Sequence, residues 1–193
     1  MKAGLMEIVF LLDRSGSMAG LEKETIEGFN SLIKQQTERE GETNVTAVLF
    51  DDQYEVLWNG ADAKKVSLSK ENYDVRGCTA LLDAIGKAIL EVGSRLQHTE
   101  ENQRPDKVMF VITTDGMENA SREFTHDKVK DLIIHQRKKY NWEFLFLGAN
   151  IDAFHEANLL GVQQDMVHEF TASAAGIEAM YSSVQESITK IVE

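Results

Sequence analysis

The sequence predicts an α/β fold: a doubly wound, mostly parallel central sheet with one antiparallel edge strand and helices on both faces. Apolar runs of strand length alternate with segments of helical periodicity along most of the chain. Several of these runs are apolar at every position, which is typical of strands buried on both faces. Strands that alternate with helices favour parallel pairing, because each helix returns the chain to the start of the next strand.

The first half of the chain begins with a strand and a helix and then doubles back. Residues 8–12 form the first apolar run, and residues 20–40 carry apolar side chains at helical spacing. Residues 45–50 and 54–58 are two β-prone runs around a short polar turn, which indicates a hairpin and supplies the antiparallel strand. A second helical stripe covers residues 82–96.

The second half continues the alternation after Pro105. Its strands are predicted at residues 108–112, 144–147 and, more weakly, 166–170. Its helices are predicted around residues 129–133, 153–160 and 177–191. No repeat or low-complexity tract interrupts this order, so the 193 residues are expected to form one domain, residues 1–193.

Composition and charge indicate the cellular compartment and exclude some classes of binding partner. The single cysteine, Cys78, cannot form an internal disulfide, and the first apolar run is too short for a signal peptide or a membrane span. We therefore expect a cytoplasmic protein. The net charge of −12 argues against nucleic acids and anionic membranes as partners, because both attract clustered Lys and Arg. The densest basic cluster, residues 137–139, is expected at a helix C-terminus, where cations suit the helix dipole.

Small oxygen-bearing side chains stand at the ends of the predicted elements. Asp13, Ser15 and Ser17 follow the first apolar strand, Asp115 follows the strand of residues 108–112, and Thr79 precedes the second helix. In open α/β sheets, ligands bind beyond the carboxyl ends of strands where the strand order reverses. If the two strands flank that point, the five side chains converge on one crevice.

The ligand types indicate a hard divalent cation. Hydroxyl and carboxylate oxygens suit Mg²⁺, with Mn²⁺ or Ca²⁺ as alternatives, and disfavour zinc in its usual soft-ligand sites. Ser15, Ser17 and Thr79 can coordinate without adding negative charge. If Asp13 and Asp115 act partly through water, the cation stays electrophilic and attracts an acidic oxygen from another molecule. The pattern therefore favours a docking site over a storage site.

The motif resembles a known family. Residues 13–17, Asp-Arg-Ser-Gly-Ser, match the Asp-x-Ser-x-Ser signature of von Willebrand factor type A domains, and Thr79 and Asp115 stand where that family places its remaining metal-site residues. The resemblance covers essentially the whole chain in length and in order of elements. It implies a Rossmann-like doubly wound fold with a metal-ion-dependent adhesion site.

The resemblance also implies roles for the five side chains. Ser15, Ser17 and Thr79 would bind the divalent ion directly, and Asp13 and Asp115 would bind it directly or through water. A partner's Asp or Glu would complete the coordination. The chain looks like the stand-alone bacterial or intracellular members, some of which work beside AAA-type ATPases or other complexes.

Each singled-out residue also has a structural interpretation. Asp13, Ser15 and Ser17 could form a helix cap and turn, Thr79 could cap the helix that follows it, and Asp115 could belong to a turn with Gly116. The acidic pair at residues 51–52 is interpreted as part of the hairpin turn, and the five scattered histidines as surface or structural residues. Cys78, where many family members carry glycine, is interpreted as a small buried residue. Met18 and Met117 are expected to fill core or surface positions, with the rim of the metal site as the alternative.

Three function classes compete. We favour a metal-dependent protein-binding module, with a metal-assisted hydrolase, such as a phosphatase, as the alternative. A haloacid-dehalogenase type of phosphatase needs an acid where Ser15 stands, and a phospho-accepting receiver needs a lysine after residues 144–147, where Gly148, Ala149 and Asn150 follow. No nucleotide-binding Gly-rich loop and no recognisable nucleophile arrangement is present, so no catalytic residue is assigned and a non-enzyme is expected.

Overall fold

A single six-stranded sheet in the order β3-β2-β1-β4-β5-β6 organises the computed structural model, which describes residues 1–193. The strands are β1 (Lys2–Asp13), β2 (Glu42–Phe50), β3 (Tyr54–Asp62), β4 (Pro105–Thr114), β5 (Glu143–Gly148) and β6 (Val167–Glu169). The helices are α1 (Glu22–Glu38), α2 (Leu81–Gln97), α3 (His126–Tyr140), α4 (Ala153–Leu159) and α5 (Ala174–Val192). Short 3₁₀ turns are η1 (Gly16–Met18), η2 (Ala63–Lys65), η3 (Glu101–Gln103) and η4 (Gln164–Met166).

The strand directions are those that the sequence predicts. β3 pairs with β2 in the antiparallel sense and forms one edge, whereas β1, β2, β4, β5 and β6 are parallel. β1 lies between β2 and β4, so the chain leaves β1 towards one edge and later returns to build the other side of the sheet. The carboxyl ends of β1 and β4 therefore meet at the point where the strand order reverses.

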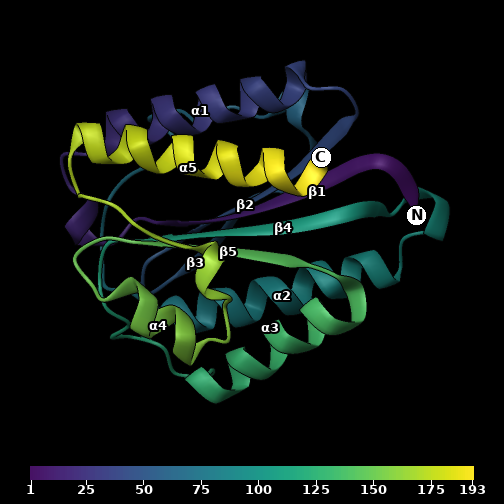
Figure 1. The fold of residues 1–193 in the computed structure, drawn as a ribbon. Coiled ribbons are helices and arrows are strands. Elements are labelled where there is room, and N and C mark those ends of the chain that lie inside the picture. Colours follow the sequence, from purple (N-terminus) through teal and green to yellow (C-terminus); the bar gives the residue numbers. More distant parts are fainter.

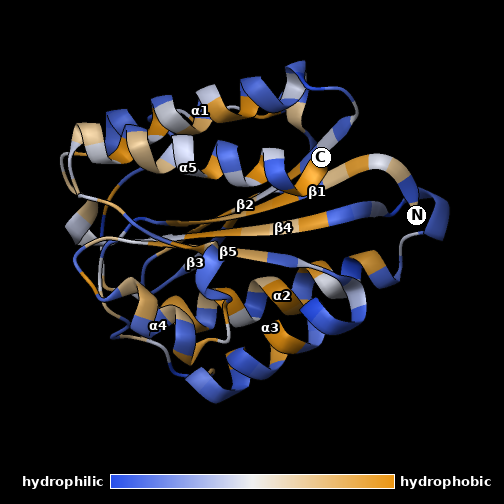
Figure 2. Cartoon of the chain, in the orientation of Figure 1, coloured by the Kyte–Doolittle hydropathy of each residue, from blue (hydrophilic) through white to orange (hydrophobic).

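Helices cover both faces of this sheet, as Figure 1 shows. α1 and α5 lie side by side on one face, and α2, α3 and α4 cover the other. Successive side chains of β1 enter opposite layers: Val9 and Leu11 pack towards α2, while Ile8, Phe10 and Leu12 pack towards α1 and α5. This alternation explains why the run has no polar face, and Figure 2 shows the apolar strands enclosed between helices with polar outer surfaces.

The element boundaries differ from the predicted ones mainly at strand ends. β1 begins at Lys2, before the apolar run, and continues through a register shift between Lys2 and Met6. β3 extends to Asp62 because an edge strand can keep pairing with polar, half-exposed residues. The weak third strand of the second half is reduced to three residues, Val167–Glu169, and a 3₁₀ turn.

Local capping explains where the later helices begin and end. The side chains of Thr125, Asp152 and Ser173 accept backbone N–H groups at the starts of α3, α4 and α5. α3 ends at Tyr140 and is capped by Asn141 in the left-handed conformation. The basic residues 137–139 lie in its last turn, as the sequence predicts. No helix has both the length and the apolar character that a membrane span requires.

Candidate metal centre

The five predicted side chains come together at the carboxyl end of the sheet. Asp13 is the last residue of β1, Ser15 and Ser17 lie in the following loop and its 3₁₀ turn, and Asp115 follows the last residue of β4. Thr79 lies two residues before α2 begins. Their convergence results from β1 and β4 being neighbours, because parallel neighbours deliver their final residues to the same edge.

Hydroxyl and carboxylate oxygens are in direct contact within this cluster. The Oγ atoms of Ser15 and Ser17 are 3.0 Å apart, and the Ser17 hydroxyl donates to Asp115 Oδ1 at 2.5 Å. A Cβ atom at Gly116 would lie 3.4 Å from Thr79 Oγ1 and 3.5 Å from Ser17 Oγ. The Thr79 and Ser17 hydroxyls therefore border the same small space.

Asp13 is held by protein donors through both carboxylate oxygens. Its Oδ1 accepts the Ser15 N–H at 2.7 Å, and its Oδ2 accepts the Thr114 hydroxyl at 2.8 Å and the Asp115 N–H at 3.4 Å. The Tyr73 hydroxyl donates to the Asp13 backbone carbonyl at 3.0 Å. Thr114 and Tyr73 were not among the predicted site residues; the position of Thr114 directly before Asp115 is the one sequence signal that could have indicated its role.

Thr79 is positioned by the loop that follows β4. Its backbone N–H donates to Asn119 Oδ1 at 2.9 Å, and the Asn119 N–H donates to the Thr79 carbonyl at 3.0 Å. Thr79 does not cap α2, contrary to one sequence interpretation, because the N-cap residue is Ala80 and no side chain of the cap residue accepts a bond. Glu118 instead accepts the N–H of Leu82 at 3.2 Å, so the Asp115 loop completes the start of α2.

The charges of the cluster are buried without a compensating cation from the protein. Asp13 and Asp115 are 2% and 1% exposed. Burial raises the pKa of Asp13 above its ordinary value, although hydrogen bonds from Ser15 and Thr114 oppose the shift. Burial also raises the pKa of Asp115; the Ser17 hydrogen bond opposes the change and the nearby charge of Asp13 adds to it.

The residues fit a hard divalent cation. Asp115 Oδ2 is buried and has no hydrogen-bond partner, so one acceptor of the cluster is unused. The chain contains no group of three or more His, Cys, Asp or Glu side chains arranged as a metal site, so a soft or imidazole-rich centre finds no support. Two carboxylates and three hydroxyls match the all-oxygen ligand sets of Mg²⁺, Mn²⁺ or Ca²⁺.

The remaining candidates have structural positions. Asp51 begins the turn between β2 and β3, where its Oδ1 accepts the Gln53 N–H at 2.9 Å, as expected of a turn residue. Met18 is 6% exposed and belongs to the core, whereas Met117 is 72% exposed beside the cluster. Cys78 is exposed, so its interpretation as a buried residue is wrong. The loop that carries it is held through the backbone of its neighbours Gly77 and Thr79, which leaves the thiol free to face solvent.

Comparison with known proteins agrees with this geometry. A family model described as the von Willebrand factor type A domain matches residues 7–182. Comparison with curated protein sequences gives no match.

Solved structures of similar fold come from a mussel, a parasite and a bacterium. Proximal thread matrix protein 1 from the mussel byssus matches with a TM-score of 0.66 and 19% identity, over 96% of this chain and 46% of that protein. Manganese-loaded TRAP protein from Plasmodium vivax matches with a TM-score of 0.65 and 16% identity, over 93% of this chain and 73% of that one. The PilB minor pilin from Streptococcus sanguinis, as a D319A mutant, matches with a TM-score of 0.65 and 11% identity, over 95% and 61% of the two chains.

These likenesses carry two consequences. The chain spans less than half the length of the mussel protein, so they establish the fold of the shared region. One structure of the mussel protein has a zinc-occupied MIDAS motif, and the Plasmodium protein is manganese-loaded.

Proposed function

The chain belongs to the von Willebrand factor type A domain family, and from that premise we propose that it is a metal-dependent protein-binding module whose ligand is an acidic side chain of a partner protein. The proposed metal residues are Asp13, Ser15, Ser17, Thr79 and Asp115. Magnesium is the proposed resident ion, with manganese as the first alternative. The observation that carries the proposal is the contact of the Ser15, Ser17 and Asp115 side chains beside an unpartnered carboxylate oxygen.

The roles of the residues follow from their contacts. Asp13 already accepts three protein donors, so it orients the loop and would reach the ion mainly through water. Ser15, Ser17 and Thr79 offer neutral oxygens, and Asp115 Oδ2 offers the free acceptor. A bound divalent ion would supply a positive centre that a partner's carboxylate can complete, because the neutral hydroxyls leave most of its charge uncompensated.

The support for a docking role is the exposure of the cluster at one point. Ser17 and Gly116 are accessible at the surface, whereas Asp13, Ser15, Thr79 and Asp115 are buried beneath them. An incoming side chain can therefore approach from the Ser17 side while the protein holds the opposite side closed. An AAA-type ATPase or another complex subunit with an exposed Asp or Glu is the proposed kind of partner.

Metal uptake and partner capture test the proposal together. Isothermal titration calorimetry should detect Mg²⁺ or Mn²⁺ binding by the wild-type chain and a loss of binding in Asp13→Ala and Ser17→Ala. Of the two, Ser17→Ala is less liable to unfold the protein, because Ser17 is exposed whereas Asp13 is buried. Asp52→Ala, an exposed carboxylate in the neighbouring hairpin turn, is the matched control and should bind normally.

Pull-downs from a lysate of the source organism then compare three baits: the wild-type chain with Mg²⁺, the wild-type chain with a chelator, and the Ser17→Ala chain with Mg²⁺. Proteins lost in both of the latter conditions but retained by Asp52→Ala are the expected partners. A parallel assay with a panel of phosphatase and esterase substrates tests the alternative function, a metal-assisted hydrolase. Metal-dependent turnover that Ser17→Ala abolishes would replace the binding module with a hydrolase, and absence of metal uptake by the wild-type chain would overturn both.

A further inference from the structure

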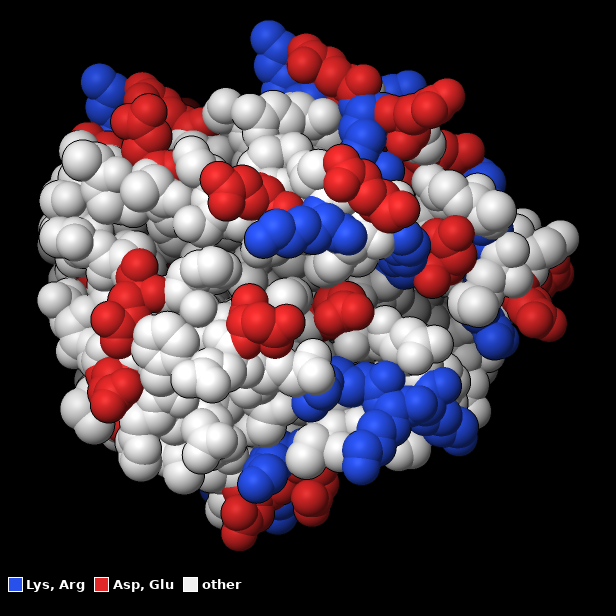
Figure 3. Space-filling view, in the orientation of Figure 1, with Lys and Arg blue, Asp and Glu red and all other residues white.

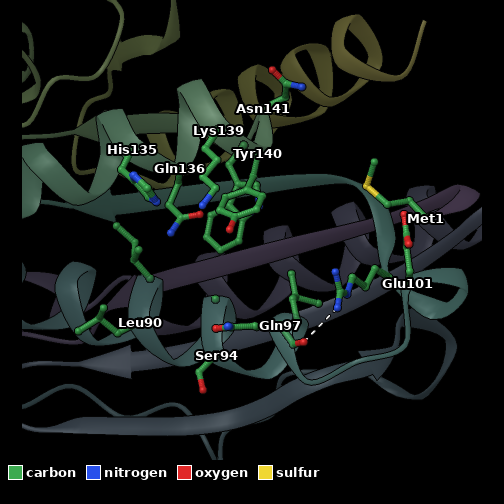
Figure 4. Close-up of a pocket in the computed structure, with 15 residues that line it drawn as sticks. Met1, Leu90, Ser94, Gln97, Glu101, His135, Gln136, Lys139, Tyr140 and Asn141 are labelled. Atoms are coloured by element: carbon green, nitrogen blue, oxygen red, sulfur yellow. Dashed lines mark hydrogen bonds between the residues drawn. The ribbon is translucent and has the colours of Figure 1, made fainter.

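A second hollow lies at the opposite end of the sheet from the metal cluster. It is a cavity of about 600 Å³ between the C-terminal halves of α2 and α3, and Figure 4 shows the side chains of the two helices on its two sides. Arg104 and Trp142 line it, and these residues directly precede β4 and β5, whereas the metal residues follow β1 and β4. Its volume lies within the roughly 300–1,000 Å³ that is typical of small-molecule sites.

The floor of the hollow is apolar and its rim exposes apolar side chains. Ile89, Leu96 and Trp142 are buried, and the Trp142 ring is stacked on Phe110 with centroids 5.4 Å apart. Three of the seven large hydrophobic side chains that the molecule exposes line this one hollow, namely Met1, Leu90 and Tyr140. Such clustering indicates a binding surface, because isolated exposed apolar residues are scattered at random over ordinary surfaces.

Gly93 keeps the floor open. It lies inside α2, where glycine weakens a helix relative to alanine. A Cβ atom at this position would meet nothing closer than Gln136 Nε2 at 3.8 Å and the Trp142 ring at 3.9 Å. Close packing of α2 and α3 therefore does not require glycine here, and the missing side chain leaves space above Trp142.

One amide oxygen beside the floor lacks a hydrogen-bond partner, and the two cations of the lining lack a carboxylate partner. Gln136 Oε1 is buried and accepts no hydrogen bond, so an occupant with an N–H or O–H group would satisfy it. Lys139 forms no ion pair, and its Nζ lies 5.3 Å from the centroid of the Tyr140 ring. Arg104 donates to the backbone carbonyls of Thr99 and Gln97 and has no carboxylate partner either.

The local charge differs from that of the whole chain. The lining contains the cations Arg104 and Lys139 but one carboxylate, Glu101. Figure 3 shows Lys and Arg gathered where α3 lies, on a molecule whose net charge is −12. An acidic group on the occupant would therefore be attracted to this rim while most of the surface repels it.

We propose that this hollow binds a small aromatic anion, with its ring system against Trp142, a hydrogen-bond donor to Gln136 Oε1 and its acidic group beside Lys139. The proposal is independent of the metal cluster.

Anilinonaphthalene sulfonate is the probe, because it combines a fused aromatic ring, an N–H donor and a sulfonate and fluoresces in apolar surroundings. The wild-type chain should bind it saturably. The indole N–H signal of Trp142 should shift in the ¹H–¹⁵N spectrum while that of Trp58, on β3, stays in place.

Variants distinguish this site from nonspecific dye binding. Gly93→Leu fills the hollow with a better helix former and should abolish the fluorescence without lowering the unfolding temperature. Lys139→Glu should weaken dye binding about fivefold, a size expected for one solvent-exposed charge pair. Lys138→Glu makes the same change in net charge in the same helical turn, outside the lining, and should change affinity less than about twofold.

Three results of the dye experiments would overturn the proposal. They are no saturable binding by the wild-type chain, equal binding by Gly93→Leu, and equal weakening by Lys139→Glu and Lys138→Glu. If a protein partner covers this hollow and prevents the dye from binding, the hollow is a protein-contact surface, and the small-molecule proposal likewise fails.

Discussion

The guanidinium of Arg14 and the carboxylate of Asp51 lie buried side by side, with Arg14 Nε 3.7 Å from Asp51 Oδ1 and both side chains 2% exposed. Arg14 is the residue between Asp13 and Ser15, and Asp51 follows β2. Arg14 Nη1 also donates to Glu55 Oε2 at 2.7 Å, and Arg76 Nε donates to Asp51 Oδ2 at 3.1 Å. A buried cation is thus surrounded by carboxylates directly behind the proposed metal loop.

Backbone hydrogen bonds join the same loops. The Arg76 N–H donates to the Arg14 carbonyl at 2.7 Å, and the Gly16 N–H donates to the Gly77 carbonyl at 3.1 Å. Gly77 has a φ of +66°, and a Cβ atom there would lie 2.5 Å from Asp51 Oδ2, so the position accepts only glycine. The loop of Ser15 and Ser17 is therefore held against the loop of Thr79.

Removing the buried cation should damage both stability and metal binding. Arg14→Met leaves Asp51 buried with Arg76 as its remaining cation, and breaking a buried pair costs about 3 kcal/mol or more of unfolding free energy. Urea unfolding measures this loss, and calorimetry should show weaker Mg²⁺ binding because the two loops are less firmly held. Arg76→Met, which removes a cation that is 45% exposed, is the control and should cost under about 1 kcal/mol. Equal losses in the two variants would contradict a central role for Arg14.

Metal binding should stabilise the wild-type chain and fail to stabilise an Asp115 variant. Asp115→Asn removes a buried charge near Asp13, so the metal-free variant should unfold at the same temperature as the wild type or higher. Addition of Mg²⁺ at a hundred times its dissociation constant should stabilise the wild type by about 2.7 kcal/mol and the variant by almost nothing. Thermal unfolding with and without Mg²⁺ gives both quantities. Asp127→Asn, an exposed change on α3, should keep the full gain, and a gain retained by Asp115→Asn would remove Asp115 from the site.

The sequence predicts the metal cluster because its members occupy strand ends and helix starts. Asp13 follows one apolar strand and Asp115 follows another. Because these two strands are parallel neighbours, both residues lie at the same edge of the sheet. The residues that hold the cluster in place could not be predicted in this way. The contact of Arg14 with Asp51 joins residues 37 positions apart, and the hydrogen bond from the Thr79 N–H to Asn119 joins residues 40 positions apart. Local sequence patterns do not indicate contacts between loops so distant in the chain. The exposure of Cys78 was mispredicted for the same reason.

The loop between β4 and α3 should loosen when Asp83 is neutralised. Asp83 lies in the first turn of α2 and accepts the N–H groups of Arg122, Glu123 and Phe124 at 2.9–3.0 Å. Partial burial alone would raise the pKa of Asp83, but these bonds and the charge of Lys87 outweigh it and hold the pKa below its ordinary 3.8. Asp83→Asn should therefore cost about 1 kcal/mol at pH 7, a modest value because the carboxylate is open to solvent.

The pH dependence of that cost follows from its sign. A carboxylate whose pKa is lowered by folding stabilises the protein fully above its ordinary pKa and loses this effect as the pH falls through the folded-state value. The difference in unfolding free energy between wild type and Asp83→Asn should thus be constant from pH 7 to about pH 5 and shrink below pH 3.8. Asp131→Asn, an exposed change on α3, should show neither the cost nor its decline. A difference that grows on acidification would contradict the assigned role.

The contact of α1 with α5 should depend on the absence of a side chain at residue 28. A Cβ atom at Gly28 would lie 2.4 Å from Cδ2 of the Tyr181 ring, which is 6% exposed and packed in the core. Gly28→Ala gains helix propensity but forces the ring to move, so it should lower the unfolding free energy by about 1–3 kcal/mol. Ser31→Ala, an exposed change about one turn further along α1, removes no such space and should be nearly neutral.

The double variant Gly28→Ala/Tyr181→Leu separates this clash from a general effect on α1. Leucine lacks the ring edge that alanine would strike, so the double variant should lose less stability than the sum of the single variants, and urea unfolding of all four chains measures the difference. Additive losses would mean that Gly28 matters for a reason other than its contact with Tyr181. Mg²⁺ binding by the same variants should be unchanged, because the hydrogen bonds of the metal cluster involve neither residue 28 nor residue 181. A loss of Mg²⁺ affinity in Gly28→Ala that Tyr181→Leu restores would instead show that the packing of α5 controls the metal site.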